Sequence, residues 1–159
     1  MSEGTNNIFI SHVHENDAEV QRLRELIAGK GYDIRDSSVD SSNPNNASSH
    51  DYIKTGILAP RIQWAGTVVV LISPDTHQSK WVNWEIEYAE KQGKRIVGVY
   101  VHGGKESDIP TAFELYGQAL VGWQADRVMD AINGAINNWE TPYGAVRDSR
   151  IIPRFSCSS

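Results

Sequence analysis

Thr67-Val68-Val69-Val70-Leu71-Ile72 is the stretch of the chain that decides its fold. It is continuously apolar and rich in β-branched residues, which is typical of a strand covered on both faces. Ser73-Pro74-Asp75 ends this strand, and apolar spacing over residues 80–92 then predicts a helix that Gly93 ends. A buried strand followed closely by an amphipathic helix indicates a parallel sheet flanked by helices.

The same alternation of short apolar runs and amphipathic segments continues on both sides of this unit. It predicts further strands at residues 8–10, 32–35, 95–101 and 120–123, and further helices at 16–30, 52–58 and 125–139, the second ending before Pro60. We therefore expect an α/β fold, a flavodoxin-like three-layer sandwich with a central parallel sheet of about five strands. This domain is expected to occupy residues 1–139, with an irregular C-terminal tail at 140–159.

Composition and charge exclude several classes of function. The chain has 159 residues and a net charge of −5, with Lys and Arg scattered, so no nucleic-acid partner is expected. A single cysteine, Cys157, excludes an internal disulfide and fits a reducing cytosol. Residues 1–7 lack a signal-peptide pattern, and the longest apolar run is too short to span a bilayer, so we expect a cytoplasmic protein without a membrane partner.

The predicted sheet indicates where a ligand would bind. In open α/β sheets, ligands lie beyond the carboxyl ends of the strands, near the point where the strand order reverses. The loops at this edge begin at Ser11, Asp36, Ser73 and His102. Three of these loops, those after the first three strands, carry polar groups suited to a ligand.

Glu85 stands apart from the other acids of the helix predicted at residues 80–92. At about 100° per residue, it lies at the edge of the apolar stripe, whereas Glu87 and Glu90 point away and should be solvated. A carboxylate that borders a core has restricted solvation, which can raise its pKa and suit it to chemistry. The alternative is that Glu85 lies in the first turn and only stabilises the helix dipole.

Other chemistries have weaker support in the sequence. His12 and His14 are two positions apart on a loop, a spacing that more often braces a loop than binds a metal, so no metal is expected. Ser11 lacks the Gly-x-Ser-x-Gly context of a nucleophile elbow. Gly103-Gly104 alone is a turn, and we find no Gly-rich phosphate loop in the sequence.

Several segments together resemble one family. Phe9-Ile10-Ser11-His12 is similar to the first strand of TIR-like domains and its exit, and Val69 to Pro74 resembles their third strand. The segment Ser79-Lys80-Trp81-Val82-Asn83-Trp84-Glu85 resembles their Ser-x-Trp-x-x-x-Glu signature, and Gly93 to Val99 matches the segment after the signature helix. The resemblance runs from about residue 7 to 138 and is closest to the bacterial branch found in Thoeris antiphage defence systems.

The resemblance implies an enzyme that cleaves the bond between nicotinamide and ribose in NAD, and releases or cyclises ADP-ribose as a signalling nucleotide. NAD is the substrate, and no cofactor is expected. By resemblance, Glu85 is the catalytic residue, and the substrate-binding residues are Ser11, His12, Asp36, Ser37, Trp81 and Trp84. The implied partners are other TIR domains, by self-association, and a separate effector reached through the nucleotide. Two alternatives stay open, a non-catalytic scaffold that acts by homotypic association and a nucleotide-binding sensor.

Overall fold

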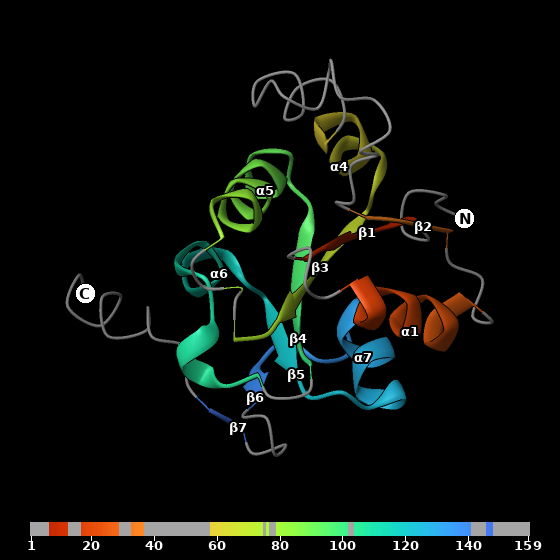
Figure 1. Cartoon of the computed structure of the whole chain (residues 1–159), viewed down its shortest axis with the longest axis vertical. Helices are drawn as coiled ribbons and strands as arrows, with labels where there is room; N and C mark the ends of the chain where they lie inside the picture. The colour runs from red at the N-terminus through yellow and green to blue at the C-terminus, as the bar shows by residue number, and fades with distance from the viewer. Residues whose placement is uncertain are drawn as a thin grey trace.

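The protein forms an α/β sandwich around one sheet (Figure 1). The structure, a computed structural model, describes residues 7–12, 17–28, 33–36, 58–74, 76, 79–101, 104–140 and 146–147. Its strands are β1 (Asn7–Ser11), β2 (Asp33–Asp36), β3 (Thr67–Ile72), β4 (Arg95–Tyr100), β5 (Ala119–Val121), β6 (Trp139–Glu140) and β7 (Val146–Arg147). Its helices are α1 (Asp17–Ala28), α4 (Ala59–Trp64), α5 (Lys80–Lys91), α6 (Thr111–Tyr116) and α7 (Ala125–Asn133), with a short 3-10 helix, η4 (Glu106–Asp108).

Five parallel strands form the centre of the sheet, in the order β2-β1-β3-β4-β5. This is the flavodoxin-like strand order, which reverses direction between β1 and β3. Strand β3 is buried at every position, as its unbroken apolar run predicts. The predicted fold class, a flavodoxin-like three-layer α/β sandwich with about five parallel strands, is therefore confirmed.

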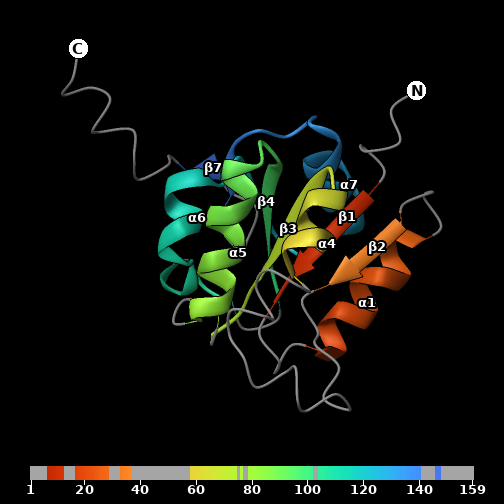
Figure 2. The same ribbon diagram turned by 90° about the horizontal axis from the view of Figure 1, so that it is seen from above.

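Alternating side chains of the strands build a separate core on each face of the sheet (Figure 2). On one face, Phe9, Val70 and Ile96 pack beneath α4, α5 and α6. On the other face, Ile10 and Val97 pack beneath α1 and α7, together with neighbouring strand residues. Because successive side chains of a strand point to opposite faces, the position along each strand determines which helices a residue meets.

Proline and glycine mark two places where the predicted helices differ from the observed ones. The helix predicted at 52–58 falls on residues of which only Leu58 is described, and Pro60, expected just beyond its end, lies in the first turn of α4. Proline fits a first turn because no hydrogen bond from its nitrogen is needed there. The helix predicted at 125–139 is too long, because Gly134 adopts a left-handed backbone, φ 89°, and ends α7 after Asn133.

The sheet also extends beyond the five expected strands. Trp139 pairs with Leu120 in parallel, so β6 continues the sheet past β5, and β7 then pairs with β6 in antiparallel orientation. The division predicted at residue 139 between the domain and an irregular tail thus falls inside β6. Among the described residues, the structure contains no helix long and apolar enough to cross a membrane.

Candidate functional site

Helix α5 starts at a defined residue, which shows whether Glu85 lies in its first turn. Ser79 has an extended backbone, and its Oγ accepts a hydrogen bond from the backbone N–H of Val82 at 3.1 Å, so it caps the helix. The helix therefore begins at Lys80, and its first turn holds no acidic residue. Because Glu85 lies in the second turn, the alternative that it only stabilises the helix dipole is wrong.

The carboxylate of Glu85 lies inside the protein. Val82, Ile86 and Ala89 form the buried side of α5, and the exposed fraction of Glu85 is 0%, like theirs. Glu87 and Glu90 are exposed, as predicted. Glu85 thus lies deeper than the edge of the apolar stripe, where the helical wheel had placed it. An ionised group in such a place loses its hydration and requires hydrogen bonds from the protein.

Strand β1 provides a hydrogen bond to this carboxylate. Ser11, the last residue of β1, has the same parity as Phe9, so its side chain faces the α5 side of the sheet. The Oγ of Ser11 donates to Oε1 of Glu85 at 2.5 Å, and both side chains have an exposed fraction of 0%. A hydrogen bond to a carboxylate is short and strong, and it stabilises the charged form against the cost of burial.

Two turns bring neighbouring strands to the same edge. After β3, the Oγ1 of Thr76 accepts from the backbone N–H of Ser73 and donates to the carbonyl of Leu71, both at 2.9 Å, and the Thr76 side chain is fully buried. After β4, the chain folds back over the end of β3, so that a Cβ on Gly104 would lie 2.2 Å from the carbonyl oxygen of Ile72. These contacts fix the carboxyl edge of the sheet beside Ser11.

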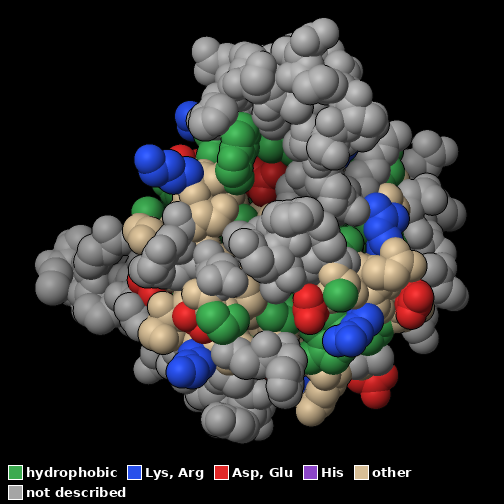
Figure 3. Space-filling view, viewed as in Figure 1, with side chains coloured by type: hydrophobic (Ala, Val, Ile, Leu, Met, Phe, Trp, Pro, Cys, Tyr) green, Lys and Arg blue, Asp and Glu red, His purple; other side chains and the backbone are tan. Residues whose placement is uncertain are grey.

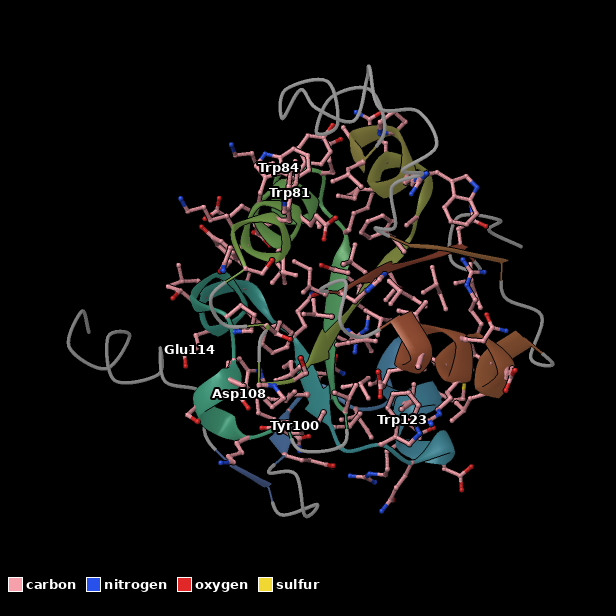
Figure 4. All side chains as sticks on the ribbon, viewed as in Figure 1. Trp81, Trp84, Tyr100, Asp108, Glu114 and Trp123 are labelled. Carbon is pink, nitrogen blue, oxygen red and sulfur yellow. The ribbon has the colours of Figure 1, made fainter. Side chains whose placement is uncertain are left out.

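Two tryptophans lie on the same helix as Glu85. Trp81 is one turn before Glu85, and Trp84 directly precedes it; both are half-buried against the core beneath α5. Figure 4 shows both on the side of α5 that turns away from α6. The ring of Trp84 stacks on Tyr88 with centroids 5.2 Å apart, and the Tyr88 hydroxyl accepts from the Gln63 amide of α4 at 2.5 Å.

The structure describes the remaining predicted site residues only in part. His12 comes directly after Ser11 and is buried, and Asp36 pairs with Ile10 at the end of β2, so both belong to the carboxyl edge. The side chain of Asp36 and the whole of Ser37 lie outside the described residues. The substrate contacts assigned to Ser11, His12, Asp36, Ser37, Trp81 and Trp84 stay predictions, as does the catalytic role of Glu85.

Several residues that shape the site were not predicted from the sequence. Asn83 links α5 to α6, because its Oδ1 accepts from the backbone N–H of Ala112 at 2.9 Å and its Nδ2 donates to the carbonyl of Ser79 at 2.9 Å. Gly104 acts through its close approach to the backbone of Ile72 on another strand, for which a sequence has no local signal. Thr76 acts within its own turn, through Ser73 and Leu71. Ser79 had such a signal, a serine just before a helical pattern.

The described part of the site contains one buried carboxylate, that of Glu85. Within the part of the chain that the structure describes, no group of three or more His, Cys, Asp and Glu side chains is arranged to hold a metal ion. Acidic and basic side chains are interspersed on the described surface that Figure 3 shows. A buried, hydrogen-bonded carboxylate can orient hydroxyl groups or stabilise a developing positive charge.

Comparison with known families identifies one matching family. Residues 9–106 match the family described as "Thoeris protein ThsB, TIR-like domain", a span that runs from β1 to the start of η4 and includes both Ser11 and Glu85. The chain belongs to this family of TIR-like domains. The predicted resemblance to a TIR-like domain close to Thoeris is thereby confirmed, and the family supports a role of this TIR-like domain in antiphage defence.

Similar solved structures are distant in sequence. A Burkholderia pseudomallei protein named as related to pilus assembly aligns with a TM-score of 0.53 and 14% identity, over 85% of this chain and 92% of that one. The CMP N-glycosidase of Clostridium botulinum aligns with a TM-score of 0.49 and 13% identity, over 80% of this chain and 98% of that one. At such identities, the likeness of the TIR-like domain to the first structure concerns the fold alone. No curated protein matches the chain in sequence.

Proposed function

We propose that this TIR-like domain cleaves the nicotinamide–ribose bond of NAD and releases or cyclises ADP-ribose as a signalling nucleotide in antiphage defence. The observation that carries the proposal is the buried carboxylate of Glu85, hydrogen-bonded by Ser11 at the carboxyl edge of the sheet. Membership of the Thoeris ThsB TIR-like family supports it. Glu85 also has the spacing from Trp81 that the resemblance requires of a catalytic glutamate.

The chemistry needs few groups from the protein. When the bond breaks, its electron pair stays on the nicotinamide nitrogen, so the cationic ring leaves as a neutral molecule and needs no proton from an acid. The ribose becomes an oxocarbenium-like cation, and a nearby carboxylate stabilises that charge or orients the ribose hydroxyls. Water then adds to this carbon and loses a proton, or a nucleophilic atom of the ADP-ribose itself adds and closes a ring.

The proposal also includes a substrate contact by Trp81 and self-association with other TIR domains. Trp81 lies one turn before Glu85, at a distance that suits contact with the nicotinamide or adenine ring. The effector is reached through the diffusible product, so this chain needs no direct contact with it. The non-catalytic scaffold and the nucleotide sensor are the outcomes against which the enzyme is tested.

The test is incubation of the purified full chain with NAD, alone and fused to an oligomerising coiled coil, with nicotinamide and nucleotide products monitored by mass spectrometry. We expect release of nicotinamide that falls at least about 100-fold in Glu85→Gln. Glu87→Gln is the matched control, since Glu87 is exposed on the same helix. Absence of nicotinamide release in both assembly states overturns the enzyme in favour of the scaffold or sensor. Undiminished release in Glu85→Gln removes Glu85 from its role.

A further inference from the structure

Ser11 was expected to bind substrate, but its hydroxyl is engaged with the protein. A serine hydroxyl has one proton to donate, and in this structure Ser11 donates it to Oε1 of Glu85. Both side chains are fully buried, so the hydrogen bond is shielded from competing water. The contact that the structure shows for the Ser11 hydroxyl therefore acts on the carboxylate.

The position of Ser11 in the sheet also suits it to immobilise another side chain. It lies in parallel register with Val70 of β3, at the end of a strand that has β2 on one side and β3 on the other. Its backbone is therefore tied to the centre of the sheet, whereas Glu85 has a longer side chain with three rotatable bonds. A rigid donor on a strand fixes the rotamer of such a side chain, which is how supporting residues preserve catalytic geometry.

We infer that Ser11 is a positioning residue that holds the carboxylate of Glu85, through Oε1, in the orientation that the reaction requires. This inference rests on the proposed function for the identity of the substrate. Loss of the hydroxyl removes this hydrogen bond and lets the carboxylate shift away from β1. Displacement of a catalytic group by about 1 Å lowers a rate by roughly 100-fold.

Steady-state kinetics with NAD separates positioning from substrate binding. In Ser11→Ala, we expect kcat to fall roughly 10- to 100-fold while KM stays within about twofold, because the ground-state contacts are kept. Ser11→Thr retains the hydroxyl on a β-branched residue suited to a strand, and it is expected to recover most of kcat. Thr67→Val is the control, since it removes a buried hydroxyl from the opposite end of the neighbouring strand β3. Thermal melting verifies that each variant is folded.

A spectroscopic measurement tests the hydrogen bond independently of turnover. In protein labelled with ¹³C at glutamate side chains, the carboxyl signal of Glu85 is the one lost in Glu85→Gln. We expect this signal to shift in Ser11→Ala and to stay in place in Thr67→Val. If wild-type protein releases no nicotinamide, the proposed function fails, and this signal alone decides the positioning role. An unchanged signal in Ser11→Ala, or a raised KM with unchanged kcat, overturns the inference.

Discussion

The hydroxyl of Ser11 and the carboxylate of Glu85 are joined by a hydrogen bond of 2.5 Å, although 74 positions separate the two residues in the chain. The sheet brings them together, because β1 ends at Ser11 on the face that α5 covers. The position of α5 matters equally. Its cap at Ser79 and its packing on β3 and β1 place the second helical turn opposite the end of β1. The pair thus joins β1, an interior strand of the sheet, to the helix that carries the family signature.

We expect the buried carboxylate of Glu85 to lower the free energy of unfolding while it supports activity. In Glu85→Met, an unbranched apolar side chain of similar length replaces a group that is costly to dehydrate. We expect the free energy of unfolding to rise by about 1 kcal/mol while nicotinamide release is lost. Urea denaturation at neutral pH measures the first effect, with Glu87→Met as the exposed control on the same helix.

A loss of stability in Glu85→Met would indicate a structural role for Glu85. A loss of stability larger than about 2 kcal/mol would mean that Glu85 serves the fold through a buried polar network rather than a reaction. The double variant Ser11→Ala with Glu85→Met separates the two partners, since it removes the serine hydroxyl that the single variant leaves without its acceptor.

Asn83 is expected to support α6 from a neighbouring helix. The residue before α6 is Pro110, which provides no side-chain cap, and Asn83 of α5 accepts the hydrogen bond of the Ala112 N–H instead. Asn83→Ala should therefore cost about 1 kcal/mol of unfolding free energy, as the loss of a helix cap does. Unchanged stability of Asn83→Ala in urea denaturation would contradict the capping role.

The fold was predictable where its cause is local. The apolar run of β3, the helical spacing of α5 and the glycine after it all lie within a few residues of the structure they determine. Strands β6 and β7 contain two residues each, too few to show a pattern, and they form only because β5 offers an edge. Helix α6 was missed for a related reason, since its six residues are held by Phe113 in the core and by Asn83.

The candidate site was predictable in part. The wheel separated Glu85 from Glu87 and Glu90, and the parallel sheet placed Ser11 and Asp36 at one edge. The sequence could not indicate the hydrogen bond of Ser11 to Glu85. This bond depends on where α5 is placed, along its axis, relative to the end of β1. The depth of Glu85 was missed as well, since a wheel describes the direction of a side chain but not the distance to the layer beneath it.

Arg95 is expected to fasten the end of α7 to the sheet. Its guanidinium donates to the carbonyls of Ala131 and Ile136 and to Oδ1 of Asn137, each at 2.8 Å. Burial lowers the pKa of Arg95, yet an arginine stays protonated in proteins, so the charged fork is the form that binds these oxygens. Arg95→Met should cost roughly 2 kcal/mol, because bonds from a charged donor to buried carbonyls are lost.

The comparison with lysine tests the geometry of this contact. Arg95→Lys keeps a positive charge but cannot reach three acceptors in a plane, so we expect it to recover less than half of the loss. Lys91→Met, at an exposed position on α5, controls for the removal of a surface charge. If lysine restored full stability in urea denaturation, charge rather than the guanidinium fork would hold the end of α7.

Gly98 is expected to be the point that lets α6 approach the sheet. A Cβ on Gly98 of β4 would lie 2.8 Å from Cζ of Phe113 and 2.9 Å from Cδ1 of Leu120, closer than side chains pack. Gly98→Ala should therefore overpack this core and cost about 2 kcal/mol of unfolding free energy.

In the variant that also carries Phe113→Leu, the smaller side chain makes room for the new methyl group. The double variant should then lose less stability than the sum of the two single variants, by about 1 kcal/mol. Gly134→Ala, whose cost comes from a left-handed backbone in open space, should add to Phe113→Leu without coupling. Strict additivity of Gly98→Ala and Phe113→Leu in urea denaturation would show that α6 adjusts by moving as a whole, and would contradict a direct contact as the reason for glycine at this position.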